Sequence, residues 1–248
     1  MGKMTLKYLQ WALLMLGFLI IAPEKAHDQR TEGPVTGDWL LLHMLSDPEQ
    51  LNPLTSNDAG ASTVLGNIFQ GLLTRDPRTL ELKPLLAKSR PVISADRRTY
   101  TFKIRRDATF QDGHPVTGED VLFSIKAIKC PLVNAPFLRV YYASVVDAEL
   151  VDDYTVQFIT KESYFLNESV LGGIDILPRH FYDPDNLLKD VTVRKLNGDS
   201  SRLSESVRRF ADQFNKHFNR NPMGSGPYKF KSWKTGQEVQ LERDPSYW

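Results

Sequence analysis

The sequence predicts a fold of the α/β class, in which short strands and amphipathic helices follow one another along the chain. In residues 99–105 apolar side chains alternate with polar ones, which places Tyr100, Phe102 and Ile104 on one face of a strand. In residues 201–218 apolar side chains recur at intervals of three and four, the spacing of one helix face. A chain of 248 residues with 41% hydrophobic and 25% charged side chains also has the composition of an ordinary globular protein.

The remaining elements are predicted from the same two periods. The almost continuously apolar run at 39–45 predicts a buried strand, in which His43 would be a hydrogen-bonded core histidine. Residues 61–72 predict a helix that ends near Gly71. Further strands are predicted at 142–150 and 154–160, with a turn between them at Asp152-Asp153.

Local turn and cap signals predict further helices and a hairpin. Asp112-Gly113 predicts a turn, and Thr117 with Asp120 has the capping-box spacing that begins a helix. Ser201 is the predicted cap of the helix that runs to Phe218. Residues 228–233 and 238–242 predict a hairpin around Thr235-Gly236.

The amino terminus predicts export. Two lysines precede an apolar run at 11–22, which is shorter than the roughly twenty residues of a membrane-spanning helix. Residues 1–26 are therefore interpreted as a signal sequence, with an uncleaved membrane tether as the alternative. The sole cysteine, Cys130, does not follow the apolar run, which argues against a lipoprotein, and we expect it to be a small buried hydrophobe. We expect a soluble periplasmic protein.

Charge argues against nucleic acid or an anionic membrane as a partner. The formal charge is +1, and residues 1–26 contain three lysines and one glutamate, so the remaining chain is close to −1. Such a balance provides no electrostatic attraction to polyanions.

Five blocks of the sequence resemble the family 5 extracellular solute-binding proteins, the peptide-binding and related receptors of bacterial ABC importers. The longest block, at 96–121, reads DRRTYTFKIRRDATFQDGHPVTGEDV and resembles the core signature of that family. Three blocks precede it, at 47–53, 67–74 and 83–87, and a fifth comes after it, at 224–230 together with 241–248. All five occur in the order of the family.

The resemblance implies a type II periplasmic-binding-protein lobe, a mixed sheet with flanking helices that carries an inserted β-rich subdomain. It implies an opening segment of this lobe at 27–72, the subdomain at 73–164, and a return segment at 165–248 that reaches a hinge. By the same resemblance the second lobe is missing, which would make the sequence a fragment or the product of a truncated gene. The lobe face that receives the returning strands would then be apolar, with an unpaired sheet edge.

The resemblance also implies a function, the capture of oligopeptides or similar small solutes and their delivery to ABC permease subunits, by a protein that is a monomer at full length and needs no cofactor. The ligand contacts implied for this chain are the loop residues Asn57, Asp58, Ala59 and Gly60 and the aromatic residues Tyr141 and Tyr142. A surface loop and subdomain packing are the alternative roles for these residues. The acidic residue that pairs with a peptide amino group belongs to the missing lobe, so we expect millimolar binding or none.

Two rival functions belong to other classes of protein. A truncated remnant or interaction protein that binds no solute is the first, and ligand titration separates it from a receptor. A secreted hydrolase is the second, but Ser225 in Gly224-Ser225-Gly226 lacks the glycine spacing of a nucleophile elbow. The five histidines are scattered, with no pair at metal-ligand spacing, so we expect neither an enzyme nor a metal site.

Overall fold

The computed structural model describes residues 37, 40–198 and 200–248. By its internal contacts the chain divides into residues 1–43 and residues 44–248, and all the helices and strands given below belong to the second unit. Within the described residues, no helix combines the length and the apolar character needed to cross a membrane. The signal sequence expected at 1–26 and its apolar run lie outside the described residues.

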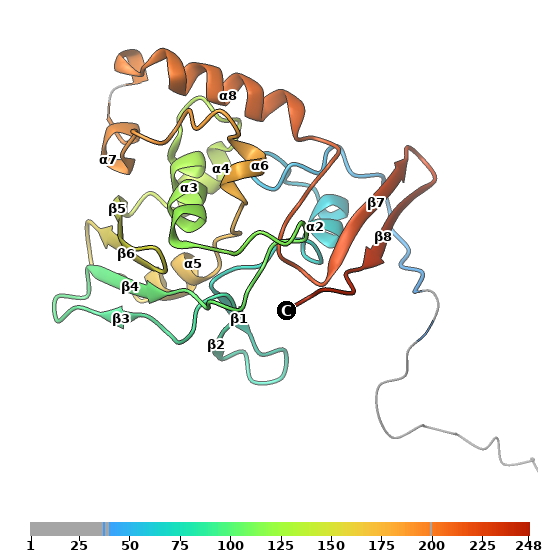
Figure 1. Ribbon diagram of the computed structural model, residues 1–248, viewed down its shortest axis with the longest axis horizontal. Helices are drawn as coiled ribbons and strands as arrows, with labels where there is room; N and C mark the ends of the chain where they lie inside the picture. Colours follow the sequence, from blue (N-terminus) through green and yellow to red (C-terminus); the bar gives the residue numbers. More distant parts are fainter. Residues whose placement is uncertain (1–36, 38–39, 199) are drawn as a thin grey trace, which may run out of the picture. The chain divides into compact units, whose positions relative to one another are not determined.

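A four-stranded antiparallel sheet contains the strands predicted in the middle of the chain, although the strand predicted at 142–150 begins only at Val145 (Figure 1). Its order is β3-β4-β6-β5, formed by β3 (Val92–Ile93), β4 (Thr99–Lys103), β6 (Thr155–Thr160) and β5 (Val145–Asp152). Tyr100 pairs with Phe158, and the rings of Phe102 and Phe158 meet edge to face at 5.9 Å. The turn that joins β5 to β6 lies at residues 153–154, one residue later than predicted, because Asp152 pairs with Thr155 as the last residue of β5. The alternation of β4 buries Tyr100 and Phe102, as its sequence pattern predicted.

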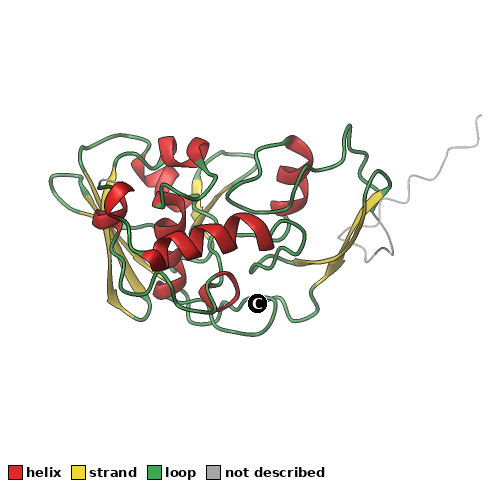
Figure 2. Cartoon of the chain, turned by 90° about the horizontal axis from the view of Figure 1, so that it is seen from above, coloured by secondary structure: helices red, strands yellow, loops and turns green. Residues whose placement is uncertain are grey.

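Two short antiparallel pairs complete the strands. They are β1 (Leu73–Arg75) with β2 (Leu82–Pro84), and β7 (Tyr228–Lys234) with β8 (Glu238–Arg243). The second pair confirms the predicted hairpin, and Gly236 in its turn has a positive φ of 73°. Every strand pair among the described residues is antiparallel, so the parallel pairing that a mixed sheet also contains is not among them. Figures 1 and 2 place the four-stranded sheet and the β7–β8 hairpin at opposite ends of the 44–248 unit, with helices between them.

Helix α3 (Gly118–Lys129) begins at the predicted capping box. Asp120 Oδ2 accepts the backbone N–H of Thr117 at 2.9 Å and its hydroxyl at 2.8 Å. Asp120 Oδ1 accepts the N–H of Arg179 at 2.9 Å, and Ser124 Oγ accepts that of Leu177 at 2.8 Å. Nearly all of α3 is buried, and its polar side chains hold the segment that enters α6 (Arg179–Tyr182).

The other helices are α2 (Ala59–Leu65), α4 (Pro136–Tyr141), α5 (Asn167–Gly172), α7 (Val193–Leu196), the 3-10 turn η1 (Ser200–Arg202) and α8 (Glu205–His217). Of these, α4 and α7 contact α3, and the apolar face of α8 closes the core. Phe210 of α8 packs edge to face on Phe123 at 5.8 Å, and Phe214 packs on Tyr182. The helix predicted at 201–218 is therefore confirmed in type, but Ser204 rather than Ser201 occupies its cap position. Cys130 is buried, as expected.

The predicted buried strand at 39–45 is wrong for the residues described. Residues 40–45 form no strand, and among the described residues no strand pairs with them. Leu41 is 91% exposed and Leu45 is fully exposed, while His43 is exposed rather than in a core. An apolar run becomes a buried strand only when another chain segment supplies the hydrogen bonds and covers its side chains. Trp39 lies outside the described residues.

The helix predicted at 61–72 is shorter than expected and lies earlier. Helix α2 begins after Asp58 and ends at Leu65, with Gly66 as its C-cap. The carbonyls of Asn67 and Ile68 accept hydrogen bonds from Tyr228 and Gly226, at 3.3 and 2.7 Å. Backbone pairing with this distant segment takes the place of a continued helix.

Candidate ligand-contacting site

Helix α4 presents aromatic side chains to solvent, and none of its residues is buried. Phe137 and Tyr141 are each 56% exposed, and their ring centroids are 5.0 Å apart. A second exposed pair, Tyr164 and Phe165, precedes α5 with ring centroids 4.8 Å apart. Solvent-exposed aromatic pairs of this kind are suited to contact a ligand or another surface.

Tyr142, the second predicted tyrosine, is a packing residue at the end of α4. Its side chain is buried and its hydroxyl donates to the Val170 carbonyl of α5 at 3.3 Å. Burial raises the pKa of Tyr142 above its usual range. The buried ammonium of Lys129 donates to the Tyr142 carbonyl at 3.1 Å, and burial, with help from Arg139 and Lys161, lowers the pKa of Lys129 to about 8. Tyr142 therefore joins α4 to α5 and leaves Tyr141 as the accessible tyrosine.

Asp175 is a partly buried carboxylate that the sequence analysis missed. Burial raises its pKa to about 6, and after burial its charge is the second cause of the raised pKa of Tyr142. Within the described part of the chain, no hydrogen bond or ion pair to its side chain is found. The only sequence signal is an acid inside the apolar run Ile174–Leu177. A partly buried carboxylate without a partner is available to bind a cation.

The predicted loop at 57–60 begins α2. Asp58 accepts the N–H of Ala61 at 2.7 Å and that of Glu49 at 3.3 Å, so its carboxylate is used as the helix cap. Gly60 is buried, and a Cβ there would lie 3.1 Å from the Ser46 carbonyl oxygen. Asn57 and Ala59 are exposed.

The structure does not bring the predicted loop and the predicted tyrosines into one cluster. Figure 1 shows α2 and α4 apart, and among the described residues no hydrogen bond or ring contact joins residues 57–60 to Tyr141 or Tyr142. The two groups are therefore separate places on the 44–248 unit.

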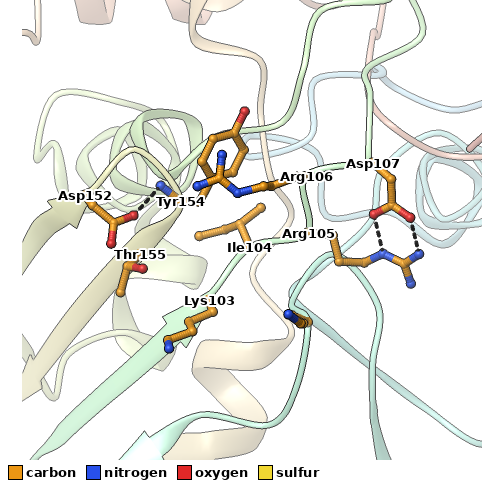
Figure 3. A pocket seen from close by; sticks show the side chains of 9 residues that line it. Lys103, Ile104, Arg105, Arg106, Asp107, Asp152, Tyr154 and Thr155 are labelled. Carbon is orange, nitrogen blue, oxygen red and sulfur yellow. Dashed lines mark hydrogen bonds and ion pairs between the residues drawn. The ribbon is translucent and has the colours of Figure 1, made fainter.

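An open depression of about 570 Å³ lies where β4 meets the following loop (Figure 3). Lys88, Lys103, Arg105 and Arg106 line it, together with Asp107, Asp152 and others. Arg105 binds Asp107 through two hydrogen bonds, of 3.0 and 2.6 Å, and Arg106 lies over the Tyr154 ring at 4.2 Å. Since both arginines already have partners, this depression is a weaker candidate for an organic ligand than the face of α4.

The comparison with known families decides the identity of the chain. Residues 81–248 match the model of the bacterial extracellular solute-binding proteins, family 5 middle. The chain belongs to this family. Members of family 5 are solute-binding proteins rather than enzymes, and Ser225 agrees with this because it is buried and donates to the Gln70 side chain at 3.2 Å.

Curated family 5 relatives and solved structures agree with this assignment. The oligopeptide-binding protein AppA of Bacillus subtilis is 30% identical over 223 residues, which cover 86% of this chain and 35% of AppA. The AppA structure in complex with a nonapeptide has a TM-score of 0.62 at 26% identity, over 82% of this chain and 36% of that one. NikZ of Campylobacter jejuni in complex with Ni(L-His) has a TM-score of 0.60 at 30% identity, over 82% and 34%. The chain thus spans about a third of the length of these relatives.

Proposed function

We propose that this chain belongs to a periplasmic receptor that captures oligopeptides or similar small solutes and delivers them to the permease of an ABC importer. Its family, and relatives named for oligopeptide binding, support this proposal. The segment boundaries at 26, 72 and 164, and a monomeric state for the full-length receptor, are part of the same proposal.

The proposed contact face consists of Phe137, Tyr141 and Asp175. An extended peptide is held largely through its backbone, while its side chains need surfaces that accept many shapes. Exposed rings on α4 offer such a surface, and the carboxylate of Asp175 would pair with an amino group or a basic side chain of the solute. The unpartnered carboxylate of Asp175, a residue that follows α5 closely in the chain, is the observation that carries this proposal.

The loop at 57–60 is a second proposed contact. Its exposed residues, Asn57 and Ala59, are small enough for a ligand backbone to approach, whereas Asp58 is engaged as the cap of α2. We therefore assign backbone contact to this loop and side-chain contact to the face of α4.

The expected affinity of the 248-residue polypeptide is low. A micromolar ligand needs about 8 kcal/mol of net binding free energy, and a pocket that achieves it encloses most of the ligand. Two exposed rings and one carboxylate cover a small part of a peptide, so we expect a dissociation constant in the millimolar range.

A chemical-shift titration tests this proposal. A pool of di- to pentapeptides is added to ¹⁵N-labelled protein, and we expect saturable shifts in α4 and in residues 172–176. Tyr141→Ala and Asp175→Asn should each weaken binding by at least about threefold, by loss of stacking and of the ion pair. Tyr228→Ala is the matched control, because Tyr228 is an exposed tyrosine on β7.

Equal affinities for the Tyr141→Ala and Tyr228→Ala proteins would contradict the proposed face. Shifts confined to residues 57–60 would reassign the contact to that loop. No shift at the highest soluble peptide concentration would favour the rival function, a chain that interacts with membrane partners without binding solute.

A further inference from the structure

Two histidines and an aspartate from distant parts of the chain meet between the turn at 112–114 and α6. Asp112 Oδ2 lies 2.6 Å from His180 Nε2 and 3.2 Å from His114 Nδ1. The two imidazole rings face each other with centroids 4.0 Å apart. One ligand atom from each of the three side chains lies within 4.8 Å of the other two.

Backbone hydrogen bonds and ring packing position the 112–114 turn and His180. Phe110 donates its N–H to the His114 carbonyl at 2.8 Å, and the N–H of Gly113 returns to the Phe110 carbonyl at 2.9 Å. Asp112 is fixed further by the His114 N–H, which donates to its Oδ1 at 3.1 Å. His180 follows Arg179, whose N–H is bound by Asp120. The Phe110 ring packs against His180 with centroids 6.0 Å apart.

Two cationic side chains from the segments around the cluster have partners of their own. The Arg179 guanidinium pairs with Glu119 at 3.3 Å and also binds Asn186. Lys229 pairs with Asp244 at 3.0 Å and donates to the Gln111 carbonyl at 2.7 Å. A cation placed among the three side chains would meet one carboxylate and two imidazoles.

We propose that Asp112, His114 and His180 form a binding site for a divalent transition-metal ion of the Zn²⁺ class. Imidazole nitrogen and carboxylate oxygen are the ligands that Zn²⁺, Ni²⁺ and Cu²⁺ share, whereas Mg²⁺ and Ca²⁺ prefer oxygen alone. Bonds of about 2.0–2.2 Å in a tetrahedral site place neighbouring ligand atoms about 3.3 Å apart. The 3.2 Å between His114 and Asp112 already fits this spacing.

Ligand atoms at most 4.8 Å apart must approach by up to about 1.5 Å to complete the site. The contact between His180 and Asp112 must open by about 0.7 Å to reach the tetrahedral spacing, and the side chain of His114 is 61% exposed and free to turn. Three protein ligands leave one position for water. The bound ion would link the 112–114 turn to α6, and this site is separate from the proposed solute-contacting face.

Metal titration of the untagged, chelator-treated 248-residue protein tests the proposal. Zn²⁺ binding is followed by calorimetry, and Co²⁺ binding by its visible absorption, which reports imidazole and carboxylate ligation. We expect one site whose affinity falls at least about tenfold in His114→Asn and in Asp112→Asn, since even the outer partners of metal ligands are worth 10- to 100-fold. His217→Asn is the matched control, because His217 is an exposed histidine in the last turn of α8.

Melting curves recorded in chelator distinguish a loss of metal binding from a loss of folding. His114→Asn should melt at the wild-type temperature without metal, and Zn²⁺ should raise the melting temperature of the wild-type and His217→Asn proteins only. Equal Zn²⁺ affinity in the wild-type and His114→Asn proteins would overturn the proposal. So would the absence of micromolar Zn²⁺ binding by the wild-type protein, or a loss of binding in His217→Asn alone.

Discussion

Asp120 and Asp175 are both at least partly shielded from solvent, but of the two only Asp120 has hydrogen-bond partners for its carboxylate among the described residues. Burial raises the pKa of both, but Asp120 accepts three hydrogen bonds that stabilise its charged form. The sequence predicted the role of Asp120, because a capping box is a local pattern of four residues. It did not predict that Asp175 would lack a partner, since that depends on every segment folded around it.

The pKa of about 6 for Asp175 predicts a pH-dependent stability. Its pKa is higher in the folded than in the unfolded chain, so the neutral form favours folding below about pH 4, and this contribution is lost as the pH rises through 6. A pKa shift of about two units corresponds to a change of about 3 kcal/mol in the free energy of unfolding. We expect about half of that value because Asp175 is partly exposed. Asp175→Asn should therefore raise the free energy of unfolding by about 1–2 kcal/mol at pH 8 and leave it nearly unchanged at pH 4.

Urea denaturation at both pH values measures this effect. Asp153→Asn is the control, because Asp153 lies in the exposed turn between β5 and β6, where a change within about 0.5 kcal/mol is expected. A loss of stability for Asp175→Asn that is the same at pH 4 and pH 8 would show that its carboxylate has a structural hydrogen bond instead.

Element boundaries depended on contacts between distant segments. The period of α8 and the alternation of β4 identified both elements, because each buries one face on the core. The predicted end of the helix at residue 72 was wrong. The Asn67 and Ile68 carbonyls accept hydrogen bonds from Tyr228 and Gly226, respectively, and the helix ends before them. Such pairing over more than 150 residues has no local signal.

Gly226 should be indispensable for this pairing. A Cβ at Gly226 would lie 2.4 Å from the Asn67 carbonyl oxygen and 2.8 Å from that of Ile68, so Gly226→Ala must separate the two segments. We expect the free energy of unfolding to fall by about 3 kcal/mol, from overpacking and loss of the Gly226 hydrogen bond. Thermal and urea denaturation measure the loss.

Gly66→Ala is the matched control for Gly226→Ala. Gly66 ends α2 with ordinary helical φ and ψ and is exposed, and a Cβ there would lie 3.2 Å from the Ser62 carbonyl oxygen, so its substitution should change stability by no more than about 1 kcal/mol. Equal effects at the two glycines would contradict the close approach of residues 67–68 and 224–228.

At the scale of the whole molecule, the exposed leucines predict self-association. Leu40, Leu41 and Leu42 are 81%, 91% and 61% exposed, and Leu45 is fully exposed. Adjacent exposed apolar side chains favour association with another surface. Light scattering should give an average mass that rises with protein concentration.

Substitution of the leucines should reverse this association. Leu41→Lys combined with Leu45→Lys should lower the average mass, because two charges interrupt the apolar run. Leu80→Lys changes a single leucine, 65% exposed, in the turn between β1 and β2, and should leave the mass unchanged. A monodisperse wild-type monomer at all concentrations would contradict the prediction.

The sequence by itself determined the family, the α/β class and the type of most elements, because motifs, caps and hydrophobic periods are properties of neighbouring residues. Only the tertiary structure showed that His114 and His180, which looked isolated, face each other across Asp112, that Asp175 has no partner among the described residues, and that Tyr142 is buried while Tyr141 is exposed. Each of these outcomes depends on which distant segments cover or meet a side chain. A one-dimensional pattern records which faces are apolar, whereas contacts between segments far apart in sequence decide which of those faces are covered.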